Sequence, residues 1–291
     1  MRAAMSGLIL FLFLISQNVM AGVPEEWTTP IDPVLIADHL YYVGSEDLAS
    51  YLIVTPGGNI LINANLKSSP ALIRASVEKL GFKWTDIKIL LNSQAHSDHM
   101  GGAAQVINET HALNMVMEGD DQVVESGGRT DFLAPSDNIP QYPPAHVDRV
   151  LHDDDKVQLG GFTLVAHKTA GHTRGCTTWT LRAHMPGDPA NQLRDIVIVG
   201  GVGFWSEYHF AESKEHHESY PGIAQDFQRT FSTLRSLHAD VFLGAHGGYF
   251  DLTEKLQRYP ALGPKVFIDP TGYQSFIDEA EQKFKDTLRG Q

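Results

Sequence analysis

The sequence contains a single cysteine, Cys176, among its 291 residues. No disulfide can therefore form within the chain. Cys176 begins the strand-like run 177–181 and follows His172 by four residues. A zinc-ligand or nucleophile role is one interpretation of that position. We favour the simpler one, a small buried apolar side chain.

Positive charge is also scarce. Lys and Arg number 22 against 35 Asp and Glu, which gives a formal net charge of −13. A nucleic-acid partner would need a basic surface, so we expect none. The balance instead indicates a soluble acidic protein.

A hydrophobic run long enough to cross a bilayer is the third missing feature. The apolar stretch 8–15 follows Arg2 and precedes Val19-Met20-Ala21, which suits a cleavage site. We interpret residues 1–21 as a secretory signal peptide, with a retained membrane anchor as the alternative. We expect a periplasmic mature protein of residues 22–291, with no membrane attachment after cleavage.

Hydrophobic patterning predicts the same order of elements twice. Strand-like segments at 34–36, 40–43, 50–54 and 59–62 precede a predicted helix at 70–80 and a buried strand at 87–91. A strand at 197–200, a helix at 223–237 and a strand at 241–244 repeat that order, and a packing helix covers 273–288. This pattern is compatible with an α/β fold of two halves.

Potential metal ligands cluster directly after the strand at 87–91. His96, Asp98 and His99 fall within four residues, before Gly101-Gly102. Imidazole and carboxylate suit zinc, and a loop at a strand end can direct such side chains to one point. His172 and His246 also follow strand-like segments.

The stretch 94–99 resembles the H-x-H-x-D-H signature of the metallo-β-lactamase superfamily, with Gln94 in the place of the first histidine. The resemblance covers nearly the whole mature chain and implies the αβ/βα sandwich fold. It also implies two adjoining zinc sites. The first would be formed by Gln94, His96 and His172, and the second by Asp98, His99 and His246.

Val202 narrows the resemblance to one branch. In other branches this place holds a metal-bridging Asp or a zinc-binding Cys, and valine can do neither. The third subclass of class B β-lactamases has no ligand there, and its GOB-type members carry Gln for His. Because Gln94 is a weaker ligand, we expect one or two zinc ions, with the second site stronger. Asn63 stands where the superfamily commonly has an Asp that supports the metal ligands from behind, and its amide can still accept one hydrogen bond and donate another.

The function implied by this resemblance is hydrolysis of the β-lactam amide of penicillins, cephalosporins and carbapenems by zinc-bound hydroxide, which confers antibiotic resistance. Asp98 would orient the nucleophile, and Tyr220 would stabilise the oxyanion unless it is only a packing aromatic. We expect a monomer. The alternatives are a zinc hydrolase of lactones or thioesters, and a non-catalytic zinc-binding protein.

Two long irregular stretches, 127–150 and 204–222, are predicted to form walls of the substrate cleft. The residue that holds the substrate carboxylate is not evident, and Ser206 and Lys214 are weak candidates. Three histidines of the second stretch are interpreted as solvated loop residues, since no spacing ties them to a metal: His209, His216 and His217.

Overall fold

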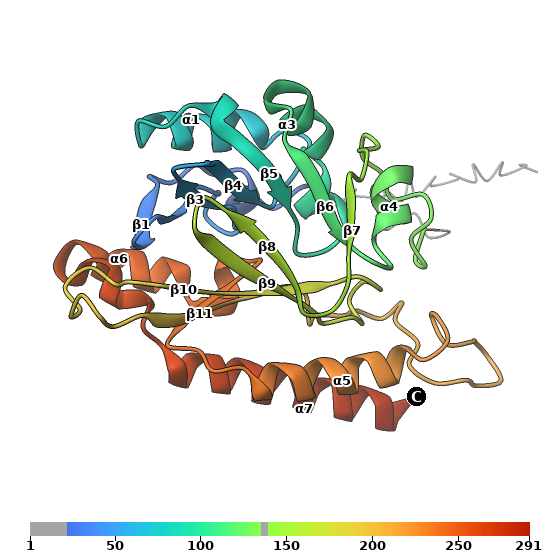
Figure 1. The fold of residues 1–291 in the computed structure, drawn as a ribbon. Coiled ribbons are helices and arrows are strands. Elements are labelled where there is room, and N and C mark those ends of the chain that lie inside the picture. The colour runs from blue at the N-terminus through green and yellow to red at the C-terminus, as the bar shows by residue number, and fades with distance from the viewer. Residues whose placement is uncertain (1–21, 135–138) are drawn as a thin grey trace, which may run out of the picture.

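The computed structural model describes residues 22–134 and 139–291 and has two β-sheets packed face to face. The predicted signal peptide, residues 1–21, lies outside the described residues. Helices cover the outer side of each sheet, so that the layers run helix, sheet, sheet, helix (Figure 1). This is the αβ/βα sandwich that the resemblance implied.

The first sheet has seven strands in chain order. They are β1 (Val34–Ala37), β2 (Leu40–Tyr42), β3 (Tyr51–Thr55), β4 (Gly58–Ile62), β5 (Ile87–Leu91), β6 (Leu113–Met117) and β7 (Arg149–Leu151). Strands β1 to β4 are antiparallel, and β4 to β7 run parallel. The predicted turn at Pro56-Gly57-Gly58 joins β3 to β4, with Thr55 paired to Gly58.

The second sheet has the order β12-β11-β10-β9-β8. Its strands are β8 (Asp155–Leu159), β9 (Phe162–Lys168), β10 (Thr177–Ala183), β11 (Arg194–Val199) and β12 (Val241–Gly244). Only β11 and β12 are parallel, and helix α5 connects them. The repeated strand–helix–strand order therefore gives a parallel crossover in each half of the molecule, β4-α1-β5 in the first and β11-α5-β12 in the second.

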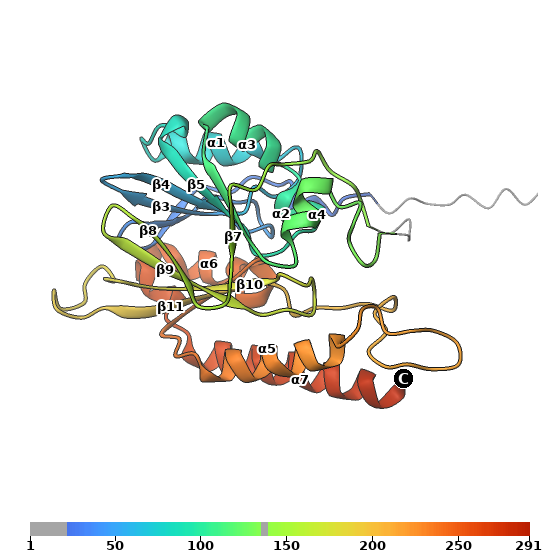
Figure 2. The ribbon, with the colours of Figure 1, turned by 45° about the vertical axis from the view of Figure 1, so that its right-hand side comes forward.

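Helices α1 (Pro70–Lys79) and α3 (Ala103–Thr110) cover the first sheet, whereas α5 (Ile223–Ser236) and α7 (Pro270–Gly290) cover the second (Figure 2). Between them in the chain lie α2 (Ser97–Met100), α4 (Asp121–Ser126) and α6 (Leu252–Leu262). Helices α1, α5 and α7 were predicted to within three residues at each end.

Two hydrophobic cores hold the layers together. The larger core fills the space between the sheets and continues to α5 and α7, with Trp179 and Phe242 among its fully buried side chains. The smaller core joins α1 and α3 to the first sheet through Ile73, Val77 and Val106. Burial on this scale is the main force that fixes the strand ends from which the candidate ligands project.

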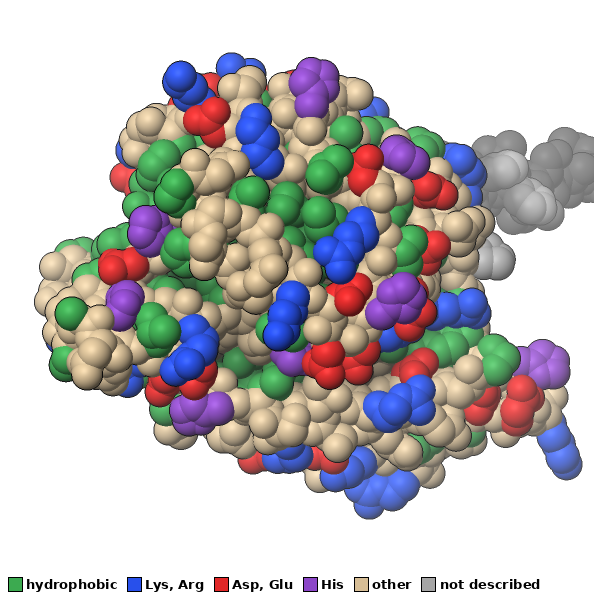
Figure 3. Space-filling model, in the orientation of Figure 1, with side chains coloured by type: hydrophobic (Ala, Val, Ile, Leu, Met, Phe, Trp, Pro, Cys, Tyr) green, Lys and Arg blue, Asp and Glu red, His purple; other side chains and the backbone are tan. Residues whose placement is uncertain are grey.

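On the surface shown in Figure 3, acidic, basic and histidine side chains are interspersed. No helix among residues 22–134 and 139–291 has the length and apolarity needed to cross a membrane.

Candidate metal centre

The loop after β5 is anchored from the neighbouring strand. Asn63 follows β4 in a left-handed conformation, with φ of 66°. Its carbonyl oxygen Oδ1 accepts a hydrogen bond from the Ser93 N–H at 2.8 Å, and its Nδ2 donates to Ser93 Oγ at 2.9 Å. The amide therefore makes both kinds of hydrogen bond that the sequence predicted for it. These bonds fix the start of the loop that carries His96, Asp98 and His99.

The predicted second site is brought together from two distant parts of the chain. Nε2 of His99 lies 3.2 Å from Nε2 of His246 and 3.2 Å from Oδ2 of Asp98. Nε2 of His246 lies 3.5 Å from the same carboxylate oxygen. Three ligand atoms thus converge on one point, and all three belong to residues that suit zinc.

The protonation states of these groups suit metal binding. Burial alone would raise the pKa of Asp98, but His99 and His246 hold this pKa well below its usual range. Asp98 is therefore an anion at neutral pH. Burial would lower the pKa of His246, yet hydrogen bonds to Asp47 and Asp98 raise it to about 9. A bound cation would displace that proton, since only the neutral ring nitrogen can be a ligand.

Asp47 fixes the orientation of His246. Its Oδ2 accepts a hydrogen bond from Nδ1 of His246 at 2.8 Å, and its Oδ1 accepts one from the Gly248 N–H at 2.9 Å. With its proton on Nδ1, the His246 ring presents Nε2 to Asp98 and His99. Carboxylates commonly orient metal-binding histidines in this way.

Two residues of the predicted first site also face each other. Nδ1 of His96 lies 3.2 Å from Nε2 of His172. Nδ1 of His172 donates to the carbonyl oxygen of Gly203 at 2.6 Å, which leaves Nε2 unprotonated. Burial, together with the nearby His96, lowers the pKa of His172 to about 3. His172 is therefore a neutral imidazole at physiological pH.

Gln94, the third predicted ligand of the first site, is buried beside these histidines. Its Oε1 accepts a hydrogen bond from the backbone N–H of His96 at 3.2 Å. The amide oxygen therefore already has a partner within the loop, and its role as a ligand stays a prediction.

The first site also has a buried carboxylate nearby, on the side of the His172 loop. Asp120 follows β6, and its two oxygens accept hydrogen bonds from Thr173 Oγ1 and from the Gly175 N–H, both at 2.7 Å. These bonds hold the loop that carries His172. Burial raises the pKa of Asp120 to about 6, even though both hydrogen bonds favour the ionised form.

Sequence reasoning missed Asp47, Asp120 and another buried carboxylate, Asp131, which lies beside His96. Asp47 and Asp131 lie far along the chain from the histidines they contact, and no spacing pattern links them. The one signal was indirect, because a histidine ligand usually has a partner on its second nitrogen.

Tyr220, the predicted oxyanion donor, packs as an aromatic side chain. It is buried, its ring lies 4.9 Å from that of Phe132, and the Arg174 guanidinium carbon lies 4.9 Å from its centroid. This packing favours the structural role that the sequence also allowed, and a catalytic role stays a prediction. Closer to the histidines is Tyr208, whose hydroxyl donates to the carbonyl oxygen of His172 at 2.7 Å.

Two residues after β11 differ in what they contact. Val202 is buried and belongs to the larger core. At Gly201, by contrast, an added Cβ would lie 2.5 Å from Cδ2 of His172. Gly201 therefore packs directly against the His172 ring, and the placement of Val202 where other branches carry a metal ligand stays a prediction.

The predicted burial of Cys176 is confirmed. Its thiol donates to the carbonyl oxygen of Gly201 at 3.3 Å, and its sulfur accepts from the Gly201 N–H at 2.8 Å. Burial raises the pKa of the thiol to about 12, which is far from that of a reactive thiolate.

The stretch 204–222 contributes one aromatic wall to the site. Trp205 is partly exposed, and its ring lies 6.0 Å from that of His96 and 5.9 Å from that of His172. The three histidines of this loop contact one another or a loop carboxylate. His209 stacks on His216 with ring centroids 3.8 Å apart, and Nδ1 of His217 lies 2.9 Å from a carboxylate oxygen of Glu212.

The two candidates for the substrate carboxylate gain no support from this loop. Ser206 donates its hydroxyl to Glu207 at 2.8 Å, and Lys214 is exposed.

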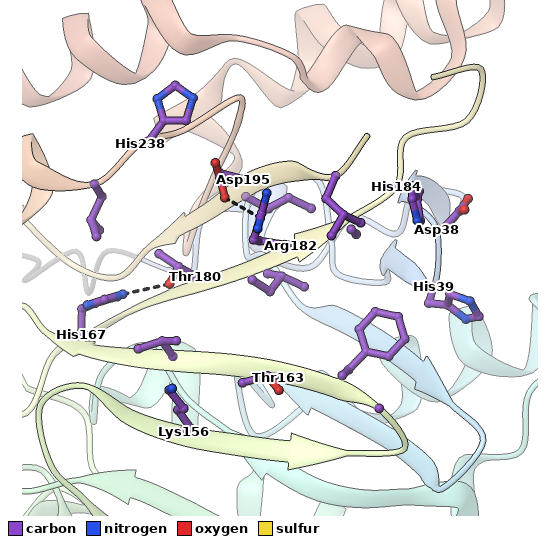
Figure 4. Close-up of a pocket in the computed structure, with 18 residues that line it drawn as sticks. Asp38, His39, Lys156, Thr163, His167, Thr180, Arg182, His184, Asp195 and His238 are labelled. Carbon is purple, nitrogen blue, oxygen red and sulfur yellow. Dashed lines mark hydrogen bonds and ion pairs between the residues drawn. The ribbon is translucent and has the colours of Figure 1, made fainter. Parts of the chain in front are cut away.

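A cavity of about 750 Å³ lies away from these ligands, on the outer side of strands β8 to β11 (Figure 4). Two pairs of its polar side chains contact each other, since Arg182 pairs with Asp195 at 3.1 Å and His167 bonds to Thr180 at 2.8 Å. None of the predicted ligands lines it, so it is separate from the candidate metal centre.

Comparison with known proteins gives one consistent result. A family model described as the metallo-beta-lactamase superfamily matches residues 48–184. The FEZ-1 metallo-β-lactamase from Legionella gormanii is 43% identical, with a TM-score of 0.85, over 90% of this chain and 97% of that chain. GOB-18 from Elizabethkingia meningoseptica is 33% identical, with a TM-score of 0.83, over 93% and 97%. LRA-12 from an Alaskan soil metagenome, described as a class B3 di-zinc enzyme, is 33% identical, with a TM-score of 0.80, over 91% and 97%.

Proposed function

This chain belongs to the metallo-β-lactamase superfamily, and we propose on that premise that it is a zinc β-lactamase of the third subclass. The observation that supports this proposal best is the convergence of Asp98 Oδ2, His99 Nε2 and His246 Nε2 in a buried site. Three protein ligands with a further position open is the pattern of a catalytic zinc rather than a structural one.

The residues present fit zinc in both charge and donor type. The second site offers one anionic oxygen and two imidazole nitrogens, and the paired atoms of His96 and His172 offer two more nitrogens. When bound in such ligands, zinc lowers the pKa of a coordinated water from 15.7 to about 7 and so supplies a nucleophile at neutral pH.

Asp98 has two tasks in this proposal. Because its pKa is held low, its carboxylate stays ionised and can accept the proton that the attacking water gives up. The same carboxylate can then carry that proton to the nitrogen of the opened β-lactam ring. Asp47 supports Asp98 indirectly, because it keeps Nε2 of His246 directed at the same point.

Trp205 is the side chain best placed to contact the substrate. It is partly exposed beside His96 and His172, where an apolar ring can cover one side of the bound lactam and exclude water. We propose penicillins, cephalosporins and carbapenems as the substrate class, and antibiotic resistance as the consequence.

We further propose that residues 1–21 direct export and that the mature enzyme acts as a monomer in the periplasm. Cell fractionation and N-terminal sequencing of the exported protein test the first part. A mature protein that began before Gly22, or that stayed in the cytoplasm, would contradict it.

Turnover assays test the proposed function directly. The purified protein should hydrolyse a chromogenic cephalosporin, lose that activity to a chelator and recover it with added zinc. An acyl-homoserine lactone and a glutathione thioester serve as the competing substrates. Faster turnover of either one would favour the lactone or thioester alternative, and zinc binding without any turnover would favour the non-catalytic one.

A further inference from the structure

Asp131 places a buried carboxylate beside the first site. Its side chain is 1% exposed, and Oδ2 lies 3.5 Å from Nε2 of His96. Oδ1 accepts a hydrogen bond from the Leu133 N–H at 2.7 Å, which fixes the orientation of the carboxylate. Burying an ionised carboxylate is costly unless it is paired, so this placement calls for an explanation.

Residues 127–134 and 139–145, which belong to the stretch 127–150, contact the metal-binding loop at two points. Helix α4 ends at Ser126, and the next two residues, Gly127 and Gly128, have φ angles of 68° and 87° that turn the chain back toward His96. Asp131 then reaches His96, and Tyr142 at the other end donates its hydroxyl to the Ala95 carbonyl oxygen at 2.5 Å. This stretch, predicted only as a wall of the cleft, is thus attached to the loop that carries the ligands.

Two other ligand histidines have a hydrogen-bonded acceptor on their second nitrogen, whereas Nε2 of His96 is buried without a hydrogen bond and faces Asp131 at 3.5 Å. Gly203 accepts the proton on Nδ1 of His172, and Asp47 accepts the proton on Nδ1 of His246. In His96 the nitrogen that faces the other ring is Nδ1, so the orienting group has to lie at Nε2. Asp131 occupies that position.

We propose that Asp131 is a positioning residue that sets the zinc affinity of the first site. It holds the proton of His96 on Nε2 and so keeps Nδ1 available as the ligand. It also supplies negative charge to a site whose predicted ligands, Gln94, His96 and His172, are all neutral. The inference rests on the proposed function only in taking zinc as the bound metal.

Replacement of Asp131 by asparagine separates charge and tautomer from shape. An asparagine whose oxygen still accepts from Leu133 turns its NH2 group toward Nε2 of His96. An NH2 group at Nε2 favours the His96 tautomer whose proton is on Nδ1. A protonated Nδ1 has no free lone pair and cannot bind a metal. Asp131→Glu keeps the charge and should restore part of the lost affinity.

The experiment uses the zinc-loaded full chain in a series of zinc buffers, with bound zinc counted by elemental analysis. Asp131→Asn should lower the affinity of the more weakly bound zinc by about 10- to 100-fold and leave the tighter zinc in place. Asp47→Asn should do the reverse, because its partner His246 belongs to the second site. Asp188→Asn is the matched control, since its carboxylate pairs with Arg194 at 2.6 Å, and should change neither.

Ring-nitrogen NMR of the zinc-loaded wild type provides a test that needs no variant. His96 should carry its proton on Nε2, with slow exchange. A proton on Nδ1, or wild-type zinc binding by a folded Asp131→Asn protein, would overturn the proposal. A wild type that never binds a second zinc would also overturn it. Because zinc is counted without substrate, loss of the β-lactamase hypothesis would appear separately, as bound zinc without turnover.

Discussion

The two halves of the metal centre obtain their negative charge in different ways. In the second site a carboxylate, Asp98, is itself among the converging ligand atoms. In the first site the carboxylates lie one step back, Asp131 beside His96 and Asp120 behind the loop of His172. A carboxylate that is itself a ligand attracts the cation at contact distance. A carboxylate behind a histidine mainly orients the imidazole ring and raises the basicity of its ligating nitrogen. The comparison therefore predicts unequal affinities from ligand sets of similar size.

The largest effect should follow from removing a ligand of the second site. Asp98→Ala or His246→Ala should lose about one bound zinc and more than about a hundredfold in turnover, since each removes one of three protein ligands. Elemental analysis and cephalosporin hydrolysis measure the two losses. If either variant kept near-wild-type turnover, the assignment of the dominant site would be wrong.

A large effect on stability is expected from Asp120, the buried carboxylate behind the first site. Its pKa is about 6 in the folded protein, against an ordinary value near 3.8. Between these two pH values the folded state holds a proton that the unfolded state has lost, so stability falls as pH rises. Ionised Asp120 thus costs on the order of 2–3 kcal/mol at pH 7.

Asp120→Asn removes this cost but also replaces one of the two acceptor oxygens with a donor, so it should raise the free energy of unfolding at pH 7 by at most that amount. The gain should shrink as the pH approaches 4. Urea unfolding of the metal-free protein at a series of pH values measures both. A variant less stable than wild type at pH 7 would show that the hydrogen bonds from Thr173 and Gly175 outweigh the cost of burying the charge.

Asp47→Asn should weaken zinc binding at the second site by about 10- to 100-fold, because His246 loses the acceptor that keeps its proton on Nδ1. Competition with a chelator of known affinity measures the change. Equal loss at both sites would mean that the two halves are not independent, and the contrast drawn above would fail.

Gln94→His sharpens the comparison from the other side. Imidazole is the better zinc ligand, so the variant should bind closer to two zinc ions. Turnover should change by less than roughly tenfold, about 1.4 kcal/mol of barrier, if the second site supplies the nucleophile. Zinc titration with turnover recorded at each step is the measurement. A rise of several hundredfold would favour a two-zinc enzyme in which Gln94 is a defect.

The smallest effect on metal content is expected at Val202. Its side chain packs in the larger core, so Val202→Ala should leave bound zinc unchanged. Gly201→Ala, one residue earlier, is the paired variant and should reduce first-site zinc, because its methyl group would press on His172. Zinc loss in Val202→Ala alone would mean that the end of β11 has been assigned wrongly.

The sequence predicted those features that depend on residues close together in the chain. Strand β5, helix α1 and the loop with His96, Asp98 and His99 are continuous segments, and their periodicity and ligand types are visible in the chain itself. Placing His172 and His246 with that loop needed the family resemblance, since nothing local joins them.

The rest depended on contacts between segments. Asp131 looks like an ordinary loop carboxylate until the turn at Gly127 and Gly128 brings it to His96. The close packing of Gly201 on His172 could not be predicted either, because the direction of a side chain at the end of a strand depends on where the strand's regular alternation stops. Tyr220 packs against Phe132, from a separate segment whose position the sequence does not give.

His99 and His246 are 147 residues apart in the chain and face each other across 3.2 Å, and that separation has a mechanical consequence. An ion held by both would act as a removable cross-link between the two halves of the sandwich. The chain has no second cysteine with which to form a disulfide. The ion cross-link would stabilise the fold in a similar way, since a disulfide that closes a loop of about 100 residues contributes on the order of 5 kcal/mol. The free energy of unfolding would then depend on the zinc concentration around the protein, and a low zinc supply would lower the stability of the fold as well as the activity.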